Sequence, residues 1–247
     1  KAYGEDPADE FSNQTLMYSL SLIGEHEEAS RISDRGHHYL ELSRGNSEAA
    51  ISIARANLEG DPDNPVTQLE MADLLYAGRQ LEEAASYYGL VMDTVPEGRI
   101  LLSPVDLTTS SMMRYAWILQ QSGDGAGAQD LLSRHRAVYL DKVEGGAAGP
   151  FDHYSEALAR AMEGDERGVV EALRLAVENG FRDRPILGEP VLDLVRSNAE
   201  FQSLNARIQG LVDQEHAEAL RIMCHENPVP DTWQPMSKTC LGISAGP

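Results

Sequence analysis

The chain has 247 residues, of which 42% are hydrophobic, and its 40 acidic side chains outnumber 20 basic ones to give a formal net charge of −20. This apolar content is sufficient for a substantial core in one elongated domain or two ordinary ones. A surface this acidic repels phosphate backbones and anionic lipid, so nucleic acid and membrane surfaces are poor partners. Because no run of about 18 apolar residues occurs, we expect no insertion of this segment into a membrane.

Residues 1–35 are predicted to form an N-terminal helical hairpin that caps the rest of the chain. Leu16, Leu20 and Ile23 share one face of a helix, and Gly24 breaks the pattern. The segment lacks the basic and then apolar order of a signal peptide, yet the sequence starts with a lysine rather than a methionine. We therefore expect the chain to be a processed or excised piece of a longer protein.

Residues 36–182 are predicted to form an array of helical hairpins. The stretch EGDPDNP contains one glycine and two prolines, which stop one helix and start the next. Pro62 recurs as Pro96, and Ala50 recurs as Ala84, in both cases 34 residues later. A constant interval of this length indicates a repeat architecture.

Three hairpins of this array are clear, and each has a glycine at its turn. Apolar residues recur at helical spacing on both sides of Gly78, of Gly123–Asp124 and of Gly164–Asp165. An insertion, EGRILLSPVD, lengthens the connection between the first two hairpins. The residues predicted to face inward are Leu69, Ala72, Leu75, Tyr76, Leu81, Ala84, Ala85, Tyr88, Val91, Tyr115, Ala116, Leu119, Ala128, Leu131, Leu132, Leu158, Ala161, Val169, Leu173 and Ala176.

Residues 183–223 are predicted to contain short helices and a long terminal helix that close the array. Asn198 is the predicted N-cap of the terminal helix. Apolar side chains at helical spacing follow the cap, namely Phe201, Leu204, Ile208, Leu211, Val212 and Leu220.

Residues 224–247 are predicted to be an irregular tail, because the stretch has three prolines between its cysteines and no helical period. A disulfide between Cys224 and Cys240 would contribute about 3 kcal/mol in the chain-entropy model. It would favour a periplasmic or other extracytoplasmic compartment. The alternatives are two free thiols in a cytoplasmic protein, or a zinc site with His216 and His225 whose spacing differs from that of zinc fingers.

The hairpins resemble the tetratricopeptide repeat family. In that family each unit has a small residue in its first helix, an alanine in its second, an aromatic residue four positions later and a final proline; Ala72, Ala84, Tyr88 and Pro96 match this pattern. The resemblance covers residues 31–182 and implies an all-α solenoid. The phrase that follows looks like the closing segment of such arrays in bacterial membrane-anchored winged-helix regulators and nucleotide cyclases.

The resemblance also implies a concave groove that is lined by the first helix of each hairpin. The family's groove positions correspond to Tyr39, Leu69, Asp73, Tyr76, Met113, Trp117 and Tyr154. Aromatic and methionine side chains supply large contact areas at low entropic cost. Leu69 and Met113 are equally explained by packing between helices, so we expect Tyr39, Tyr76 and Trp117 to be the main binding residues.

No enzyme motif is present, since the phosphate loop, the dinucleotide fingerprint and the HExxH zinc motif are all missing. The stretch GISAG around Ser244 matches GxSxG but lacks the flanking strand and helix of a nucleophile elbow. His37 and His38 are neighbours that point about 100° apart on a helix, which favours surface or groove histidines over a metal site. We expect no catalytic residue, no metal and no cofactor.

The sequence therefore predicts a non-enzymatic module that binds a protein or peptide. Its acidic rim favours a basic ligand, and the resemblance makes it a sensor or interaction domain of a larger bacterial regulator. The alternative is a structural scaffold or a homodimer that assembles through the terminal helix near Leu204 and Leu211 and through the convex face.

Overall fold

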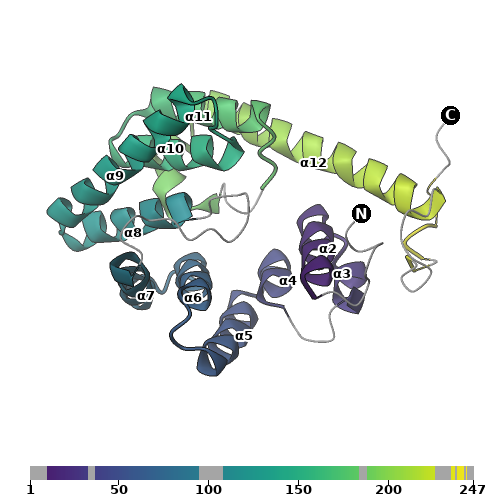
Figure 1. Ribbon diagram of the computed structural model, residues 1–247. Helices are drawn as coiled ribbons and strands as arrows, with labels where there is room; N and C mark the ends of the chain where they lie inside the picture. Colours follow the sequence, from purple (N-terminus) through teal and green to yellow (C-terminus); the bar gives the residue numbers. More distant parts are fainter. Residues whose placement is uncertain are drawn as a thin grey trace. The chain divides into compact units, whose positions relative to one another are not determined.

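The computed structural model describes residues 10–32, 37–94, 108–183, 188–225, 235–236, 238–241 and 243. In these ranges every regular element is a helix and no strand occurs, which confirms the predicted all-α class. The helices pair as hairpins along the chain (Figure 1). The chain divides into two compact units, of which unit 1 contains residues 1–53 and 209–247 and unit 2 contains residues 54–208.

The described part of unit 1 begins with a short hairpin of two helices, and the predicted role of residues 1–35 as a cap of the array stays a prediction. Gly24 turns the chain with a left-handed φ of 92°, a conformation that glycine adopts without steric penalty. The core of the unit is Met17, Leu20, Ala29 and Leu40, with Met223 packed against it. The helices of unit 1 are α2 (Glu10–Ile23), α3 (His26–Ile32), α4 (His38–Ser43), the first part of α5 (Ser47–Gly60) and the last part of α12 (Ala199–His225).

Unit 2 contains the three predicted hairpins in chain order. Its helices are α6 (Pro65–Ala77), α7 (Leu81–Thr94), α8 (Thr108–Ser122), α9 (Gly125–Glu144), α10 (Pro150–Met162) and α11 (Glu166–Glu178), followed by the 3₁₀ helix η2 (Pro190–Val195). α6 pairs with α7, α8 with α9, and α10 with α11. α8 also packs on both α6 and α10, so the first helices of the hairpins form one layer, called here the first-helix layer (Figure 1).

Two of the hairpin turns share the sequence pattern GDxxG. Gly123 and Gly164 turn with φ values of 90° and 75°, and the aspartate that follows each caps the next helix. Asp165 Oδ1 accepts a hydrogen bond of 2.9 Å from the amide of Gly168. A Cβ atom on Gly168 would lie only 2.2 Å from the other oxygen of this carboxylate, so the close approach requires glycine.

The stretch EGDPDNP ends α5 and starts α6, as predicted. Gly60 is the last residue of α5, and Pro65 opens α6 at a position where a missing amide donor has no effect. Asn64 caps the helix by accepting a hydrogen bond of 2.9 Å from the amide of Val66. The predicted cap of the terminal helix is also present, because Asn198 Oδ1 accepts from the amide of Glu200 at 2.9 Å.

Other parts of the predicted organisation differ or are not described. The tail was expected to begin at residue 224, but α12 extends to His225, so the first residues of the predicted tail are helical. The insertion EGRILLSPVD and Pro96 lie outside the described residues. Hairpin packing in unit 2 follows chain order, while the solenoid path of the whole array stays a prediction.

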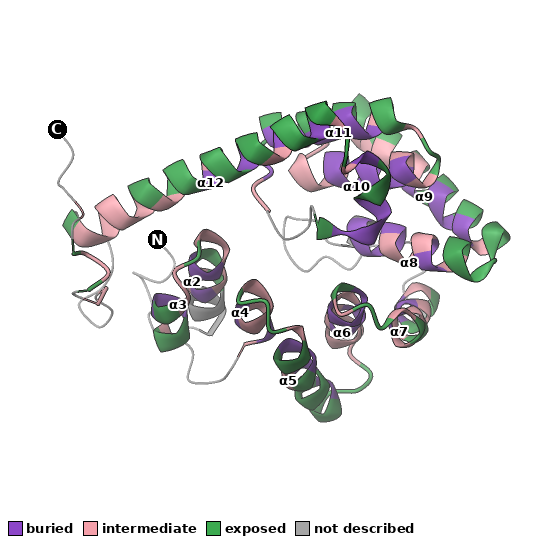
Figure 2. Cartoon of the chain, turned by 180° about the vertical axis from the view of Figure 1, so that it is seen from behind, coloured by how far each residue is buried: buried purple, intermediate pink, exposed green. Residues whose placement is uncertain are grey.

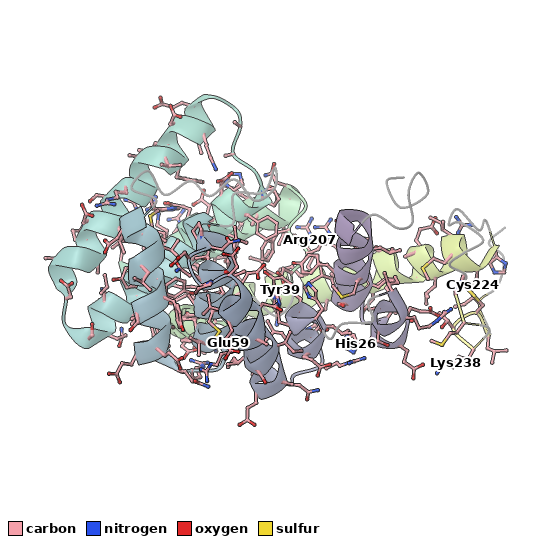
Figure 3. The ribbon with its side chains drawn as sticks, turned by 60° about the horizontal axis from the view of Figure 1, so that its bottom comes forward. His26, Tyr39, Glu59, Arg207, Cys224 and Lys238 are labelled. Atoms are coloured by element: carbon pink, nitrogen blue, oxygen red, sulfur yellow. A yellow bond between two sulfur atoms is a disulfide. The ribbon has the colours of Figure 1, made fainter. Side chains whose placement is uncertain are left out.

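The cysteine pair forms the predicted disulfide (Figure 3), and two described residues of the tail, Met236 and Thr239, bind α3 within unit 1. Glu28 on α3 is fully buried, and its Oε1 accepts 2.6 Å hydrogen bonds from the amide of Met236 and from the hydroxyl of Thr239. Its Oε2 accepts from Arg31 at 2.7 Å. Lys238 pairs with a neighbouring glutamate of α3. The buried Glu28 carboxylate therefore accepts hydrogen bonds from the turn that the disulfide links to α12.

Removal of the disulfide should release this turn. With Cys224→Ser and Cys240→Ser, the closed loop is lost, and the Met236 amide should exchange its hydrogen about tenfold to a hundredfold faster. Hydrogen exchange followed by mass spectrometry or NMR measures this rate, with the amide of Ala72 in unit 2 as an unchanged reference. Unchanged protection at Met236 would mean that Glu28 holds the tail without the covalent link.

Candidate functional site

The predicted groove residues lie in both units. Asp73 and Tyr76 are on α6, Met113 and Trp117 are on α8, and Tyr154 is on α10, so five of them belong to the first-helix layer of unit 2. The Tyr76 and Trp117 rings meet edge to face, with centroids 6.0 Å apart. Tyr39 belongs instead to α4 of unit 1. The structure thus defines a candidate site in unit 2 and describes Tyr39 separately.

Tyr39 is part of an aromatic cluster inside unit 1. Its ring lies 5.2 Å from that of Tyr18 and 4.3 Å from that of His38. His38 is 3% exposed, so the expectation of a surface or groove histidine is wrong for this residue. Burial, together with the neighbouring His37, lowers the pKa of His38 to about 3. The imidazole is therefore neutral and serves as core packing material.

Four of the predicted groove residues have no open surface, and Leu69 is one of them with 2% exposure. Met113 and Tyr154 are fully buried and Tyr76 is 2% exposed, which corrects the expectation that they line an empty groove. Tyr154 stacks on Phe181 with centroids 4.8 Å apart. Trp117 is half-buried, and the Asp73 side chain retains 29% of its exposure. Only the edge of the predicted groove is thus accessible.

Arg114, on α8, is the centre of the buried site. Its Nη1 donates to Asp73 Oδ1 at 2.8 Å, its Nε donates to Glu189 Oε1 at 2.8 Å, and its Nη2 donates to the same glutamate oxygen. The guanidinium carbon also lies 5.7 Å from the centre of the Tyr76 ring. Burial alone would lower the pKa of Arg114, but Glu189 and then Asp73 outweigh it and raise the pKa. Arg114 is therefore a permanent cation held between two carboxylates.

Hydroxyl groups add hydrogen bonds to both carboxylates. Tyr88 from α7 donates to Asp73 at 2.6 Å, and Ser111 from α8 donates to the same carboxylate at 3.0 Å. Tyr154 donates to Glu189. Burial raises the pKa of both tyrosines well above the usual range, so their hydroxyls stay protonated and act as donors.

Glu189 comes from a stretch that follows the hairpins, called here the docked segment (residues 188–195), in which Pro190–Val195 form the 3₁₀ helix η2. η2, which follows Glu189, packs on α10 and α11, and the light-green η2 lies beside α10 in Figure 1. Pro190, Val191 and Leu192 are buried, whereas Gly188 is exposed. Asp193 and Leu194 are exposed as well. The docked segment thus fills the part of the first-helix layer where an open groove was expected.

The hydrogen bonding around the docked segment is incomplete in the part of the chain that the structure describes. Glu189 Oε2 is buried without a hydrogen-bond partner. The Tyr76 hydroxyl is buried near the Val191 backbone but makes no well-formed hydrogen bond. Burial raises the pKa of Glu189, although Arg114 acts in the opposite direction. The Glu189 carboxylate is therefore held through Oε1, while Oε2 accepts no hydrogen bond from the described residues.

A second acidic group adjoins the site at its accessible edge. Glu70 lies one helical turn before Asp73 on α6 and is half-buried. Burial, and then the charge of Asp73, raise the pKa of Glu70 to about 7. Glu70 and the exposed edge of Asp73 are called here the acidic rim.

The described residues provide no set of groups for metal chemistry. No cluster of three or more histidine, cysteine, aspartate or glutamate side chains there could hold a metal ion. No helix among these residues combines the length and apolarity that crossing a membrane requires. An open depression at the α6–α7 turn is lined by Arg79, Gln80, Leu81, Glu82, Glu83 and Ser86, and by none of the predicted groove residues.

Comparison with protein-family models and with curated proteins gave no match.

Sequence reasoning missed the charged centre of the site. Arg114 was passed over because it stands in the apolar stretch SMMRYAWIL, where the surrounding residues were assigned to packing. A lone arginine on a helix face that is otherwise buried is the signal that predicts a paired charge. Glu189 gave a similar signal, since it is the first residue of the otherwise apolar EPVL.

Loss of the Arg114 charge should strongly destabilise unit 2. Arg114→Met leaves the buried Glu189 and the partly exposed Asp73 without their cation, and we expect the free energy of unfolding to fall by about 3 to 5 kcal/mol. The matched control is Arg55→Met, because Arg55 pairs with Glu83 at 2.8 Å on the exposed surface and such a pair contributes less than about 1 kcal/mol. Urea unfolding followed by circular dichroism compares the two. Equal effects would contradict the buried pair.

Stability should fall with rising pH because of Glu70. The folded chain holds the Glu70 proton up to a pKa of about 7, whereas the unfolded chain releases it near 4.5. The folded state thus binds more protons between these values, and stability decreases as the pH rises through this window. Glu70→Gln should remove a penalty of at most about 3 kcal/mol at high pH and change little at low pH. Urea midpoints of both chains across the window test this difference.

Proposed function

We propose that this chain is a non-enzymatic protein-binding module of the tetratricopeptide type, which captures extended segments on its first-helix layer. The observation that carries the proposal is the docked segment, which this layer already binds. It holds Glu189 by charge and buries three consecutive apolar residues after it. A surface that binds one segment in this manner has the anchors that peptide recognition needs.

The acidic rim supports a basic partner segment. Glu70 and Asp73 are both partly accessible, and Trp117 is the half-buried aromatic residue beside Tyr76. A lysine or arginine at the rim would lower the electrostatic repulsion between the two carboxylates and could lie against the tryptophan. Binding at the rim leaves the docked segment in place.

The same proposal assigns the cellular context. A disulfide persists in an oxidising compartment, so we place the module outside the cytoplasm, as the sensor or interaction part of a larger bacterial regulator. This placement rests on the cysteine pair and on the resemblance of the hairpins.

A scaffold or dimerisation role is the second candidate, and one observation favours it. The second helices of the hairpins expose large apolar side chains, namely Leu90, Leu140, Val143 and Leu175. Exposed residues are green along α9 and α11 in Figure 2. The terminal helix is weaker support, because Leu204 is buried within the chain. This role predicts concentration-dependent dimers that Leu140→Glu abolishes.

A fluorescence titration tests the peptide-binding proposal. In a Trp233→Phe background Trp117 is the single tryptophan, and its emission should change when a lysine-bearing apolar peptide binds. We expect this peptide to bind at least about tenfold more tightly than a length-matched glutamate peptide, with an affinity that falls as salt increases. Asp73→Asn should weaken binding by about tenfold.

The matched control is Glu171→Gln, which neutralises an exposed glutamate on α11, a second helix. It should leave the affinity unchanged, because Glu171 is not part of the rim. Equal affinities for the lysine and glutamate peptides, or equal losses with Asp73→Asn and Glu171→Gln, would reject the rim as the binding site.

A further inference from the structure

Three donors of the hairpins converge on one carboxylate position. Arg114 points both Nε and Nη2 at Glu189 Oε1, and the hydroxyl of Tyr154 donates to the same side chain. A guanidinium edge and a phenol hydroxyl are donors that match a carboxylate. Arg114 and Tyr154 are called here the carboxylate seat.

The hairpins supply both residues of the seat and the groups that position them. Asp73 positions the guanidinium from behind through a hydrogen bond of 2.8 Å. Asp73 is itself held by Tyr88 and Ser111, which belong to α7 and α8. Stacking on Phe181 holds the ring of Tyr154. Only the carboxylate comes from outside the hairpins, in the way that a ligand would.

The first residue of the occupant is extended, and the three residues that follow it belong to the 3₁₀ helix η2. Glu189 has φ −63° and ψ 143°, which is close to polyproline II, and Pro190 follows it. Four consecutive residues, Glu189 to Leu192, are buried, and residues on both sides of them are exposed. The buried stretch is therefore flanked by exposed residues at both of its ends.

In the part of the chain that the structure describes, the docked segment leaves some hydrogen-bonding groups of the site without a partner. Glu189 Oε2 has no hydrogen-bond partner among the described residues, and neither does the nearby Tyr76 hydroxyl. An unsatisfied buried acceptor weakens the hold of the segment on the seat. A competing segment whose carboxylate accepts hydrogen bonds at both oxygens would bind the seat more tightly.

We propose that the carboxylate seat binds a segment of a partner protein in which an acidic residue is followed by proline and two aliphatic residues, in exchange for Glu189–Leu192 of this chain. The inference rests on the proposed function and names the partner chemistry for the deep part of the site, while basic residues of the same partner meet the acidic rim. The docked segment is the internal competitor. Because it is tethered, its effective concentration is on the order of millimolar, and it lowers the apparent affinity for a partner.

A labelled peptide tests the exchange on the full chain. The probe is the octapeptide GEPVLDLV, acetylated, amidated and tagged with fluorescein, and binding is followed by fluorescence anisotropy. Glu189→Ala with Leu192→Ala empties the seat, so the probe should bind this variant at least about tenfold more tightly than it binds the unmodified chain. Replacing the glutamate of the probe by glutamine should weaken binding by about tenfold or more.

The matched control alters neighbouring residues of the same kinds that are exposed. Asp193→Ala with Leu194→Ala leaves the four buried residues intact, and this variant should bind the probe no better than the unmodified chain does. If the emptied variant does not fold alone, Glu189→Gln keeps the shape of the segment. The probe should then raise the thermal midpoint of that chain more than the glutamine probe does.

Equal binding of the glutamate and glutamine probes by a folded, emptied chain overturns the inference, and so does no binding at all. If lysine peptides still bind at the acidic rim in the same preparation, the inference alone has failed. If neither the rim nor the seat binds its peptide, the proposed function fails with it.

Discussion

The arrangement of unit 2 depends on one buried charge, the guanidinium of Arg114. A cation that is removed from water requires anionic partners with good hydrogen-bond geometry, because the desolvation penalty otherwise exceeds any gain. Asp73 supplies one partner from α6, and Glu189 supplies the other from a stretch that follows all three hairpins. The guanidinium therefore determines both where α6 and α8 meet and where the chain returns after α11. An apolar residue at position 114 could fill the volume but could not specify which segment docks there.

The hairpins bring the partners of this charge together through local signals. In the GDxxG turns a left-handed glycine ends one helix, and the aspartate begins the next by capping it. Small residues then allow close helix packing, as with Ala72 and Ala84, both fully buried. These features act within a few residues of the chain, which is why the helices of unit 2 and their turns could be predicted from the sequence.

The candidate site was only partly predictable because its decisive contacts are long-range. The repeat resemblance directed attention to Tyr76 and Tyr154, but a repeat pattern gives the direction of a side chain and not what covers it. The cover is the docked segment, and its Glu189 is 75 positions from Arg114 in the sequence. Similarly, no local pattern connects Glu28 to Met236, which is 208 positions away. The position of such a contact follows from the assembled helices.

Two side chains that carry opposite charges, Glu28 and Arg114, each hold a stretch of chain outside the α-helices, and each does so within its own unit. Glu28 accepts hydrogen bonds from the amide of Met236 and the hydroxyl of Thr239, and Arg114 donates hydrogen bonds to Glu189. The two cases differ in their tethers. The tail turn is linked covalently to α12 by the disulfide, so its release from Glu28 does not remove it from the neighbourhood. The docked segment has no cross-link and is held by hydrogen bonds, charge and apolar burial alone. Of the two, the contact on Arg114 is therefore the one that another chain can replace by equilibrium competition, because every interaction that retains the segment is one that a partner can supply.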